Sequence, residues 1–332
     1  MAKRPQSREA IKRTPPSVEP IRAQGFIVPA PVQVRAIKPD EITPAVRLLL
    51  KGNCSAHELP THITRFLAMA AEEGYDLSRQ MVVETGGELT YACLYVLRPG
   101  RMSYVFTAQP GRNPSEAVEA LRQLSQWAFK DGSRYLQILL EPNQPQRAEL
   151  SLLAGYRRLT DLYYLACRLN EVEIPAEVPY QDIDWRDYDD AHADLFRRTI
   201  AETYIQSLDC PELAQIRSLE DTFSGFLQET GSGRCLWRLL RYQGKPAGVL
   251  LLTRLKQVAW MELTYMGIVP ALRGRGWGRL LLEEALRMSR QNDSEVIMLA
   301  VDQRNHPARR LYQQFGFNEM LARQIFYETP AY

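Results

Sequence analysis

The stretch that most constrains the fold is an apolar, β-prone segment (260–269) that runs through a glycine-rich turn into a helical pattern (280–286). Pro270 ends the first segment, and the apolar periodicity of the second segment is typical of a helix. Gly274, Gly276 and Gly278 lie between the two segments. The sequence therefore predicts a strand, a glycine-rich turn and a helix N-terminus in direct succession.

Such a turn is suited to binding a diphosphate group. The first N–H groups of a helix have no intrahelical acceptor, and the helix dipole places partial positive charge at the same end. Glycines let a phosphate approach the backbone, and Arg273, Arg275 and Arg279 add full charges around it. No Lys-Ser or Lys-Thr pair follows the glycines, as a P-loop requires, and the spacing is not that of a dinucleotide fingerprint.

The turn resembles the acyl-CoA loop of the GNAT superfamily of N-acetyltransferases, whose pattern is Gln or Arg, two residues, Gly, one residue, then Gly or Ala. Arg273, Gly276 and Gly278 occupy those places. The chain also resembles the second part of the family signature. A buried-strand run (296–301) is followed by a helix (305–317) that contains Leu-Tyr-x-x-x-Gly-Phe. The resemblance implies an acyltransferase with acetyl-CoA as co-substrate and without a metal.

The same resemblance implies which residues contact acetyl-CoA. In the family the pantetheine arm lies along the strand before the loop and bonds to it as an additional strand would. Gly267 is expected to permit a bulge that admits the arm. Asn305 resembles the family's carrier-binding Asn, and capping of the next helix is its alternative role. The expected contacts are Met266, Gly267, Ile268, Arg273, Gly274, Arg275, Gly276, Trp277, Gly278, Arg279 and Asn305.

Acyl transfer to an amine also needs a base and an acid. Glu262 is the candidate base: it alternates with Thr264 and Met266 on one face of the expected strand. Its segment resembles tandem GNAT enzymes of the mycothiol synthase type, whose base is a Glu at this spacing, whereas many other members have the acid two residues later, at the place of Thr264. Tyr312 is the candidate acid, because the family's Tyr directs its hydroxyl at the thioester sulfur and a phenol stays protonated at neutral pH. A solvent-facing Glu and a packing Tyr are the alternatives.

The acceptor has weaker signals. In tandem GNATs the first two helices of the active copy shape the acceptor pocket. In this chain the loop 203–211 links those two helices and is therefore the candidate segment. Tyr204 and Asp209 are the candidate acceptor contacts, although a loop that links two helices has the same residue types. We expect a small-molecule or peptide amine as the acceptor.

The 332 residues are enough for two domains, and the chain resembles an internal duplication with an offset of 161 positions. We expect a disordered basic tail (1–31), a degenerate GNAT-like domain (32–172) and a catalytic GNAT domain (178–332). Each domain would be an α/β (α+β) unit, a mixed and mostly antiparallel sheet flanked by helices. At this offset Glu262 falls on Arg101, so the first copy has the fold pattern without the chemistry. We expect it to support the second copy and to help wall in the acceptor site.

The secondary-structure pattern places helices at 188–202 and 211–230 ahead of a hairpin in the second copy. In the first copy a turn at 109–114 is a candidate for residual acyl-CoA binding, because it precedes a helix start.

Composition limits the remaining classes. With 45% apolar and 24% charged residues the chain is typical of a globular protein, and no apolar run is long enough to cross a membrane. The tail has six basic and two acidic residues, so the net charge of +2 leaves about −2 for the remainder, which argues against a nucleic-acid surface. Five scattered cysteines show no metal-ligand spacing. We expect a cytoplasmic protein, monomeric or homodimeric, that binds neither nucleic acid nor membranes.

The sequence thus predicts a tandem GNAT acyltransferase that moves an acetyl group to a primary amine by direct attack. The alternatives are a non-catalytic acyl-CoA-binding module and a protein N-terminal or lysine acetyltransferase.

Overall fold

The computed structural model describes residues 31–111, 114–175, 182–229, 235–255 and 258–330. The described residues from Val32 onward form one compact unit. The expected tail (1–31) lies outside the described residues except for Pro31, and the turn at 109–114 is described only in part. None of the described helices combines the length and apolar character that a membrane span requires.

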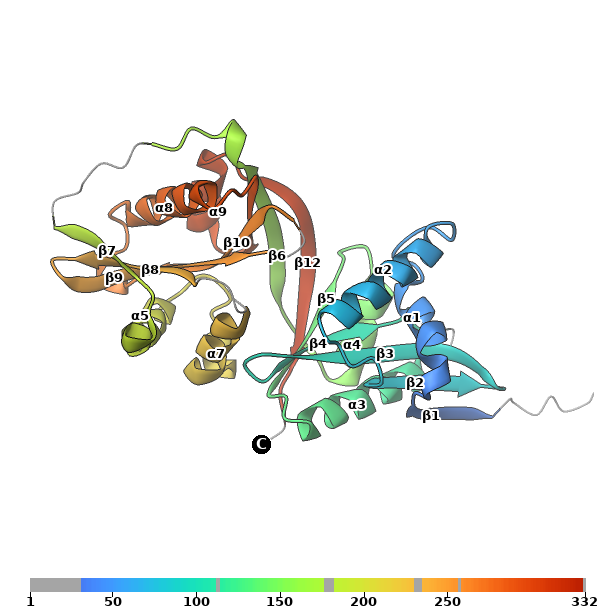
Figure 1. Cartoon of the computed structure of the whole chain (residues 1–332). Helices are drawn as coiled ribbons and strands as arrows, with labels where there is room; N and C mark the ends of the chain where they lie inside the picture. The colour runs from blue at the N-terminus through green and yellow to red at the C-terminus, as the bar shows by residue number, and fades with distance from the viewer. Residues whose placement is uncertain (1–30, 112–113, 176–181, 230–234, 256–257, 331–332) are drawn as a thin grey trace, which may run out of the picture. The chain divides into compact units, whose positions relative to one another are not determined.

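The first half of the unit alternates strands with helices on both sides of a sheet (Figure 1). Its elements are β1 (Val32–Ala36), α1 (Ile42–Leu50), α2 (Leu59–Glu72), β2 (Gln80–Thr85), β3 (Glu88–Arg98), β4 (Met102–Thr107), α3 (Ser115–Lys130), β5 (Tyr135–Leu140), α4 (Pro145–Ala154) and β6 (Arg157–Arg168).

The second half repeats this order of elements. Its elements are β7 (Ile183–Asp187), α5 (Ala193–Tyr204), α6 (Leu213–Ile216), α7 (Leu219–Glu229), β8 (Leu236–Tyr242), β9 (Lys245–Arg254), β10 (Trp260–Ile268), α8 (Trp277–Gln291), β11 (Val296–Asp302), α9 (His306–Gln314) and β12 (Asn318–Glu328). The starts of β5 and β11, of α4 and α9, and of β6 and β12 each lie 161 positions apart, which is the offset expected from the sequence.

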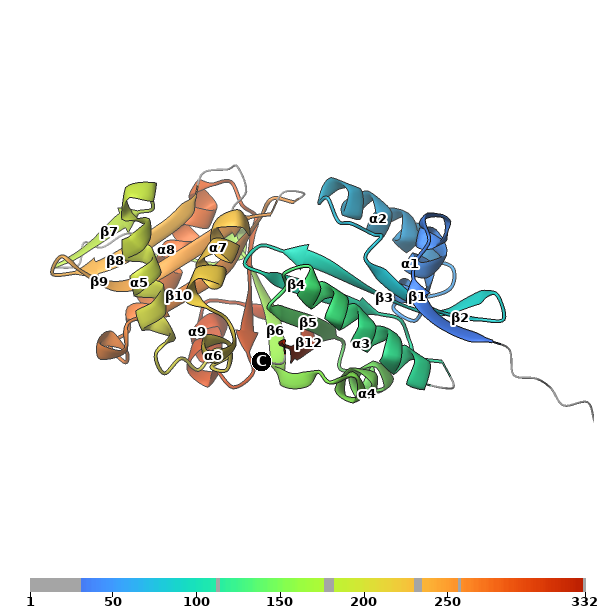
Figure 2. The same ribbon diagram turned by 90° about the horizontal axis from the view of Figure 1, so that it is seen from below.

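All the strands belong to a single sheet with the order β1-β2-β3-β4-β5-β12-β6-β11-β10-β9-β8-β7. Only β4–β5 and β10–β11 are parallel pairs among the described strands. The last strand of each half has changed sides: β12 pairs with β5 of the first half, and β6 pairs with β11 of the second. Figures 1 and 2 both show β6 and β12 side by side at the junction, where they pair with each other.

Separate apolar clusters lie on the two faces of the second half. Leu281, Leu282 and Leu286 of α8 pack into one of them, and Phe196 of α5 packs with Trp237 of β8 in the other. Figure 1 shows α8 and α9 on the face of the sheet opposite α5 and α7. The active-copy motifs therefore lie on one face, and the helices expected to shape the acceptor pocket lie on the other.

Two helices of the second half differ from the sequence prediction. The helix expected at 188–202 begins only at Ala193, because Asp189 caps a short 3-10 turn through a bond from the His192 N–H. The helix expected at 211–230 is divided into α6 and α7 at Arg217, whose backbone is extended. Ser218 then caps α7 by accepting the N–H of Asp221, at 3.0 Å.

Candidate functional site

The strand that carries the candidate base separates from its neighbour. Only Trp260, Met261 and Glu262 of β10 pair with β11, whereas on its other side β10 stays paired with β9 as far as Ile268. The segment 263–268 therefore has no strand pairing on its β11 side within the described residues. An unpaired strand edge presents N–H and C=O groups to which an extended ligand can bond.

The bulge that accompanies this separation lies at Thr264. The register of β10 against β9 shifts between Leu263 and Tyr265, and the Thr264 hydroxyl donates to Thr253 Oγ1 at 2.8 Å. The expectation that Gly267 supplies the bulge is wrong, since Gly267 stays in regular register with β9.

Gly267 instead permits a close approach of α5. A Cβ at this position would lie 2.7 Å from Thr203 Cβ and 3.0 Å from the hydroxyl oxygen of Tyr265. Any side chain here would force α5 away from β10.

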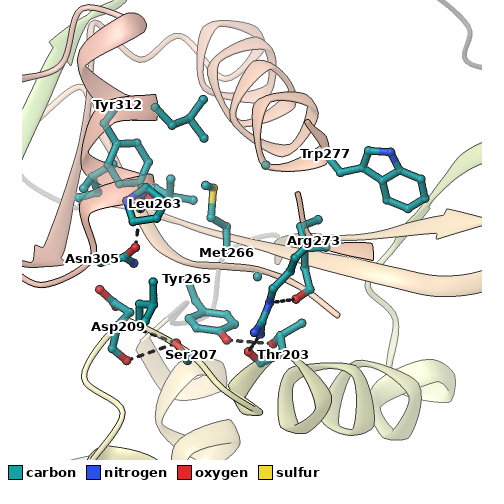
Figure 3. A pocket seen from close by; sticks show the side chains of 18 of the residues that line it. Thr203, Ser207, Asp209, Leu263, Tyr265, Met266, Arg273, Trp277, Asn305 and Tyr312 are labelled. Atoms are coloured by element: carbon teal, nitrogen blue, oxygen red, sulfur yellow. Dashed lines mark hydrogen bonds between the residues drawn. The ribbon is translucent and has the colours of Figure 1, made fainter. Parts of the chain in front are cut away.

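A cavity of about 500 Å³ opens at the separated strands. Most of the predicted site residues line it: Met266, Gly267, Ile268, Arg273, Gly274, Gly276, Trp277, Gly278, Asn305 and Tyr312. Figure 3 shows Tyr312 approaching from α9 and Asn305 from the N-cap of that helix. Met266 and Tyr265 leave β10 in opposite directions, and Asp209 approaches from the chain after α5. The predicted contacts Arg275 and Arg279 do not line this cavity.

The glycine-rich turn ends at the N-terminus of α8 inside the cavity. Gly274 and Gly276 have φ values of +75° and +81°, a conformation that favours glycine, and Gly276 is the N-cap of α8. A Cβ at either position would meet no protein atom within 4 Å. The Arg279 N–H donates to the Gly276 carbonyl at 2.9 Å, but because no side chain caps α8, the N–H groups ahead of Arg279 remain available to an anion.

The three arginines of the turn have different surroundings. Arg273 donates to the carbonyl oxygens of Ile268 at 3.0 Å, Gln206 at 3.0 Å and Thr203 at 2.8 Å. Its guanidinium thus joins the turn to β10 and α5, rather than supplying free charge to a phosphate.

The other two arginines lie at the surface. Arg279 is paired with Glu283 at 2.9 Å and lies 4.9 Å from the ring centre of Phe315. Arg275 is exposed, and no hydrogen bond or ion pair of its side chain is recorded within the described residues. Arg275 is therefore the arginine of this turn that is free to add charge near the α8 N-terminus.

Tyr312 is 7% exposed and packs against Phe317, with ring centres 5.6 Å apart. Burial, and then the charge of Asp209, raise the pKa of Tyr312 well above its ordinary value. Its phenol therefore stays protonated at neutral pH, as a proton donor requires. Asn305 accepts the N–H of Ala308 at 3.3 Å as the N-cap of α9, and also bonds to Asp209.

Asp209 lies beside a second buried carboxyl group, that of Asp302. Burial raises the pKa of Asp209, although bonds from the Asp302 N–H, at 2.9 Å, and from Asn305 oppose the shift. Burial also acts to raise the pKa of Asp302, but hydrogen bonds from Arg304 and Thr160 outweigh it and leave this pKa below its ordinary value.

A second cavity, of about 470 Å³, lies on the other side of β10. It shares Asp209, Thr264, Tyr265 and Ala300 with the first cavity, so the two have common walls. Glu262 and Tyr204 line only the second cavity, and Tyr312 lines only the first. The candidate base and the candidate acid thus face different but adjoining spaces.

We expected the first half to help wall in the acceptor site, and it lines the second cavity, but the sequence did not indicate through which residues. Its contribution comes from β4, β5, β6 and the turn before β4, through Pro99, Met102, Tyr104, Gln137 and Leu162. Phe226 of α7 and Arg217 between α6 and α7 were also missed. These residues lie far in sequence from the family motifs, and no local pattern distinguishes them from packing residues.

The first half has a shorter connection at the equivalent place. From Trp260, where pairing with β11 begins, to the start of α8 at Trp277 the chain advances 17 positions, against 13 from Met102 to Ser115 in the first half. By this pairing the counterpart of Glu262 is Tyr104, and not Arg101 as the constant offset suggested. The difference of four residues includes the Thr264 bulge and the longer turn, the two features that form the first cavity.

Part of the second half is similar in sequence to known acetyltransferases. Residues 194–317 match the family model described as the acetyltransferase (GNAT) family. Over 69 residues the chain is 36% identical to a mycothiol acetyltransferase of Thermomonospora curvata, which covers 21% of this chain and 23% of that protein. Over 66 residues it is 33% identical to a [ribosomal protein bS18]-alanine N-acetyltransferase of Haemophilus influenzae, covering 20% of this chain and 44% of that protein. Both alignments span less than half of the relative's length.

The fold has a counterpart among solved structures. A GCN5-related N-acetyltransferase from Sphaerobacter thermophilus superposes with a TM-score of 0.60 at 17% sequence identity, over 91% of this chain and 97% of that one. At this identity the likeness concerns the fold alone.

Proposed function

We propose that this protein transfers an acetyl group from acetyl-CoA to a primary amine by direct attack of the amine on the thioester, and the match of residues 194–317 to the acetyltransferase (GNAT) family model supports the proposal. The observation that carries the proposal is the cavity in which the unpaired edge of β10 leads to the uncapped N-terminus of α8. An extended arm that ends in a diphosphate matches both features in order.

In this proposal the diphosphate lies against the N–H groups at the start of α8. The pantetheine arm bonds to the backbone of 263–268 as an added strand. The thioester then lies near the walls that the two cavities share, which include Thr264 and Asp209. The amine approaches from the second cavity.

The reaction needs two proton transfers. Glu262, on the wall of the second cavity, accepts a proton from the attacking amine directly or through a water molecule. The amine nitrogen bonds to the acetyl carbon as the bond from that carbon to sulfur breaks. Tyr312, which is protonated at neutral pH, gives its proton to the departing thiolate.

The first test is acetyl-CoA-dependent release of free thiol with a panel of amines and short peptides. We expect Glu262→Gln to lower kcat by about 10²- to 10⁴-fold, the range for a general base, and Tyr312→Phe to lower it for the analogous reason. Both variants should bind acetyl-CoA with unchanged affinity in calorimetry, since neither side chain is placed against the diphosphate. Tyr75→Phe, in the first half, serves as a control that leaves kcat unchanged.

Two results would contradict the proposal. Acetyl-CoA binding without turnover of any amine would favour a binding module, the alternative predicted from the sequence. Full activity of both variants would remove Glu262 and Tyr312 from the proton transfers.

A further inference from the structure

The second cavity contains an arginine that the proposed chemistry does not use. Arg217 follows α6 with extended backbone and lines the cavity together with Glu262 and Asp209. No hydrogen bond of its guanidinium is recorded within the part of the chain that the structure describes, and its buried Nε has no partner. Arg217 is half-buried, and a cation that is partly removed from water without a hydrogen-bond acceptor is in an unfavourable place, because the lost water contacts are not replaced.

The guanidinium is fixed in place by its surroundings. It lies 5.9 Å from the ring centre of Tyr135, and a Cβ on Gly100 would come within 2.9 Å of Nη2. Nη2 is also the atom nearest to a Cβ placed on Gly225 of α7, at 3.4 Å. The Arg217 guanidinium therefore lies between the two halves, in a space that exists because Gly100 and Gly225 have no side chains.

The nearest acidic group does not neutralise Arg217. Asp221 interacts with Arg217 through its charge, but its two oxygens accept bonds from Arg101 at 2.6 and 2.8 Å, and Ser218 donates at 2.7 Å. Two arginines thus face a single carboxylate. One positive charge is therefore in excess beside this end of the cavity, which Arg217 lines.

The same cavity has the opposite charge elsewhere on its walls, at Glu262 and Asp209. Aromatic side chains also line this cavity: Tyr104, Tyr204, Tyr265 and Phe226. A ligand with one charge of each sign is complementary to such a space, and a planar guanidinium matches a carboxylate or a phosphate in geometry.

We propose that the acceptor is a primary amine that also has an anionic group, a carboxylate or a phosphate, which binds Arg217 while the amine lies at Glu262. This proposal rests on the acyltransferase function proposed above and specifies its substrate class. It also gives the first half a role, since Arg217 is held against that half and Tyr104 and Gln137 complete the cavity wall.

The test compares acceptors that differ only in the anionic group. Thiol release from acetyl-CoA is measured with L-amino acids against their amides, and with phosphoethanolamine against ethanolamine. We expect kcat/KM to be at least about tenfold higher for the anionic member of one pair, since a charge-assisted hydrogen bond contributes that much or more. The pair that shows the difference identifies the anion as carboxylate or phosphate.

Variants of Arg217 distinguish a role in binding the anionic group of the acceptor from a role in stabilising the fold. Arg217→Gln should lower kcat/KM for the anionic acceptor by about 10- to 100-fold, mainly through KM, and leave the neutral acceptor unchanged. Arg217→Lys should recover part of the loss because it keeps the charge. Arg198→Gln, on the exposed side of α5 with Asp194 as its ion-pair partner, is the matched control and should change neither acceptor.

Turnover of neutral amines equal to that of the anionic ones, with Arg217→Gln indifferent to the acceptor, would overturn the anionic substrate class and leave the acyltransferase proposal standing. A loss of acetyl-CoA affinity or of thermal stability in Arg217→Gln, equal for both acceptors, would assign Arg217 to packing between the halves. No turnover of any acceptor would overturn both proposals.

Discussion

At the scale of single residues, Gly276 combines a backbone requirement with a binding requirement. Its φ of +81° disfavours any residue with a Cβ. A Cβ there would contact no protein atom and would point into the space assigned to the diphosphate.

Gly276→Ala is therefore expected to lower the free energy of unfolding by about 1 kcal/mol and to weaken acetyl-CoA binding by tenfold or more. Denaturant unfolding and calorimetry measure the two effects. Gly87→Ala is the control, since Gly87 has a φ of +88° in open space within the β2–β3 turn. It should have the same effect on stability and none on binding. Equal binding losses in both variants would show that the effect at Gly276 is not local.

Asp302 gives a prediction about pH. Its carboxylate is fully buried and accepts bonds from Thr160 at 2.8 Å, Arg304 at 2.7 Å and the Cys210 N–H at 3.1 Å. Its pKa is lower in the folded protein than its ordinary value of about 3.9. The stabilisation it provides is therefore present above that ordinary pKa and is lost as pH falls through the folded pKa.

Asp302→Asn should thus lower the free energy of unfolding by about 2 kcal/mol at neutral pH. The difference from the unmodified protein should be constant above about pH 5 and shrink below about pH 4. Urea titrations at a series of pH values measure it. A difference that does not change with pH would mean that Asp302 stabilises by packing and not by charge.

At the scale of elements, Arg273 is the connection among β10, α5 and the glycine-rich turn. Its three donors reach three different carbonyl groups. A lysine has a single nitrogen and cannot span them.

Arg273→Lys is expected to lower the free energy of unfolding by about 1–2 kcal/mol and to raise the Kd for acetyl-CoA, because the turn is no longer held against α5. Arg275→Gln is the matched comparison in the same turn, where no bond is lost. It should leave stability unchanged and weaken binding only at low salt. The prediction fails if Arg275→Gln destabilises the protein as much as Arg273→Lys does.

The sequence predicted the fold class and the motifs better than it predicted helix boundaries and the position of the β-bulge. The family match from 194 to 317 and the fold class agree with the prediction, because they depend on local periodicity and on motifs of fixed spacing. The division at Ser218 was missed because the apolar pattern continues across it. The bulge was assigned to Gly267 because glycine is the usual signal, whereas Thr264 forms it through a bond to the neighbouring strand.

In the candidate site, too, the sequence predicted the residues that belong to local motifs and missed those that only the tertiary fold brings together. Residues near the glycine-rich turn were predicted to contact acetyl-CoA, and most of them line one cavity, while the contacts themselves stay predictions. The roles of Glu262 and Tyr312 stay predictions, as does a domain boundary near 172. Arg217 and Tyr104 could not be predicted, because each becomes a wall residue only when strands from opposite halves are brought together.

At the scale of the whole molecule, the exchange of β6 and β12 joins the two halves. Without β12 the edge of β5 is open, and without β6 the edge of β11 is open. An apolar cluster across the junction contains Met102 and Tyr135 of the first half and Cys210 and Ile325 of the second.

Fragments 32–172 and 173–332 expressed separately are therefore expected to aggregate or to remain partly unfolded, because each exposes a long unpaired strand edge. Expressed together, they should co-purify as a complex that unfolds in one transition. Circular dichroism and size-exclusion chromatography distinguish these states. A monomeric, folded 173–332 fragment that binds acetyl-CoA would show that β6 is dispensable for the second half.

The placement of β12 also affects how the protein is made. Residues 318–328 are translated after every other strand of the sheet, yet they fill a gap in its middle, against β5 and β6. While the ribosome is still at work, a nascent chain that already holds all of β1–β6 must keep that gap open. The β5–β12 and β12–β6 pairs thus wait for the last strand to emerge, and a stalled ribosome or a premature stop codon near residue 317 would leave the facing edges of β5 and β6 unpaired.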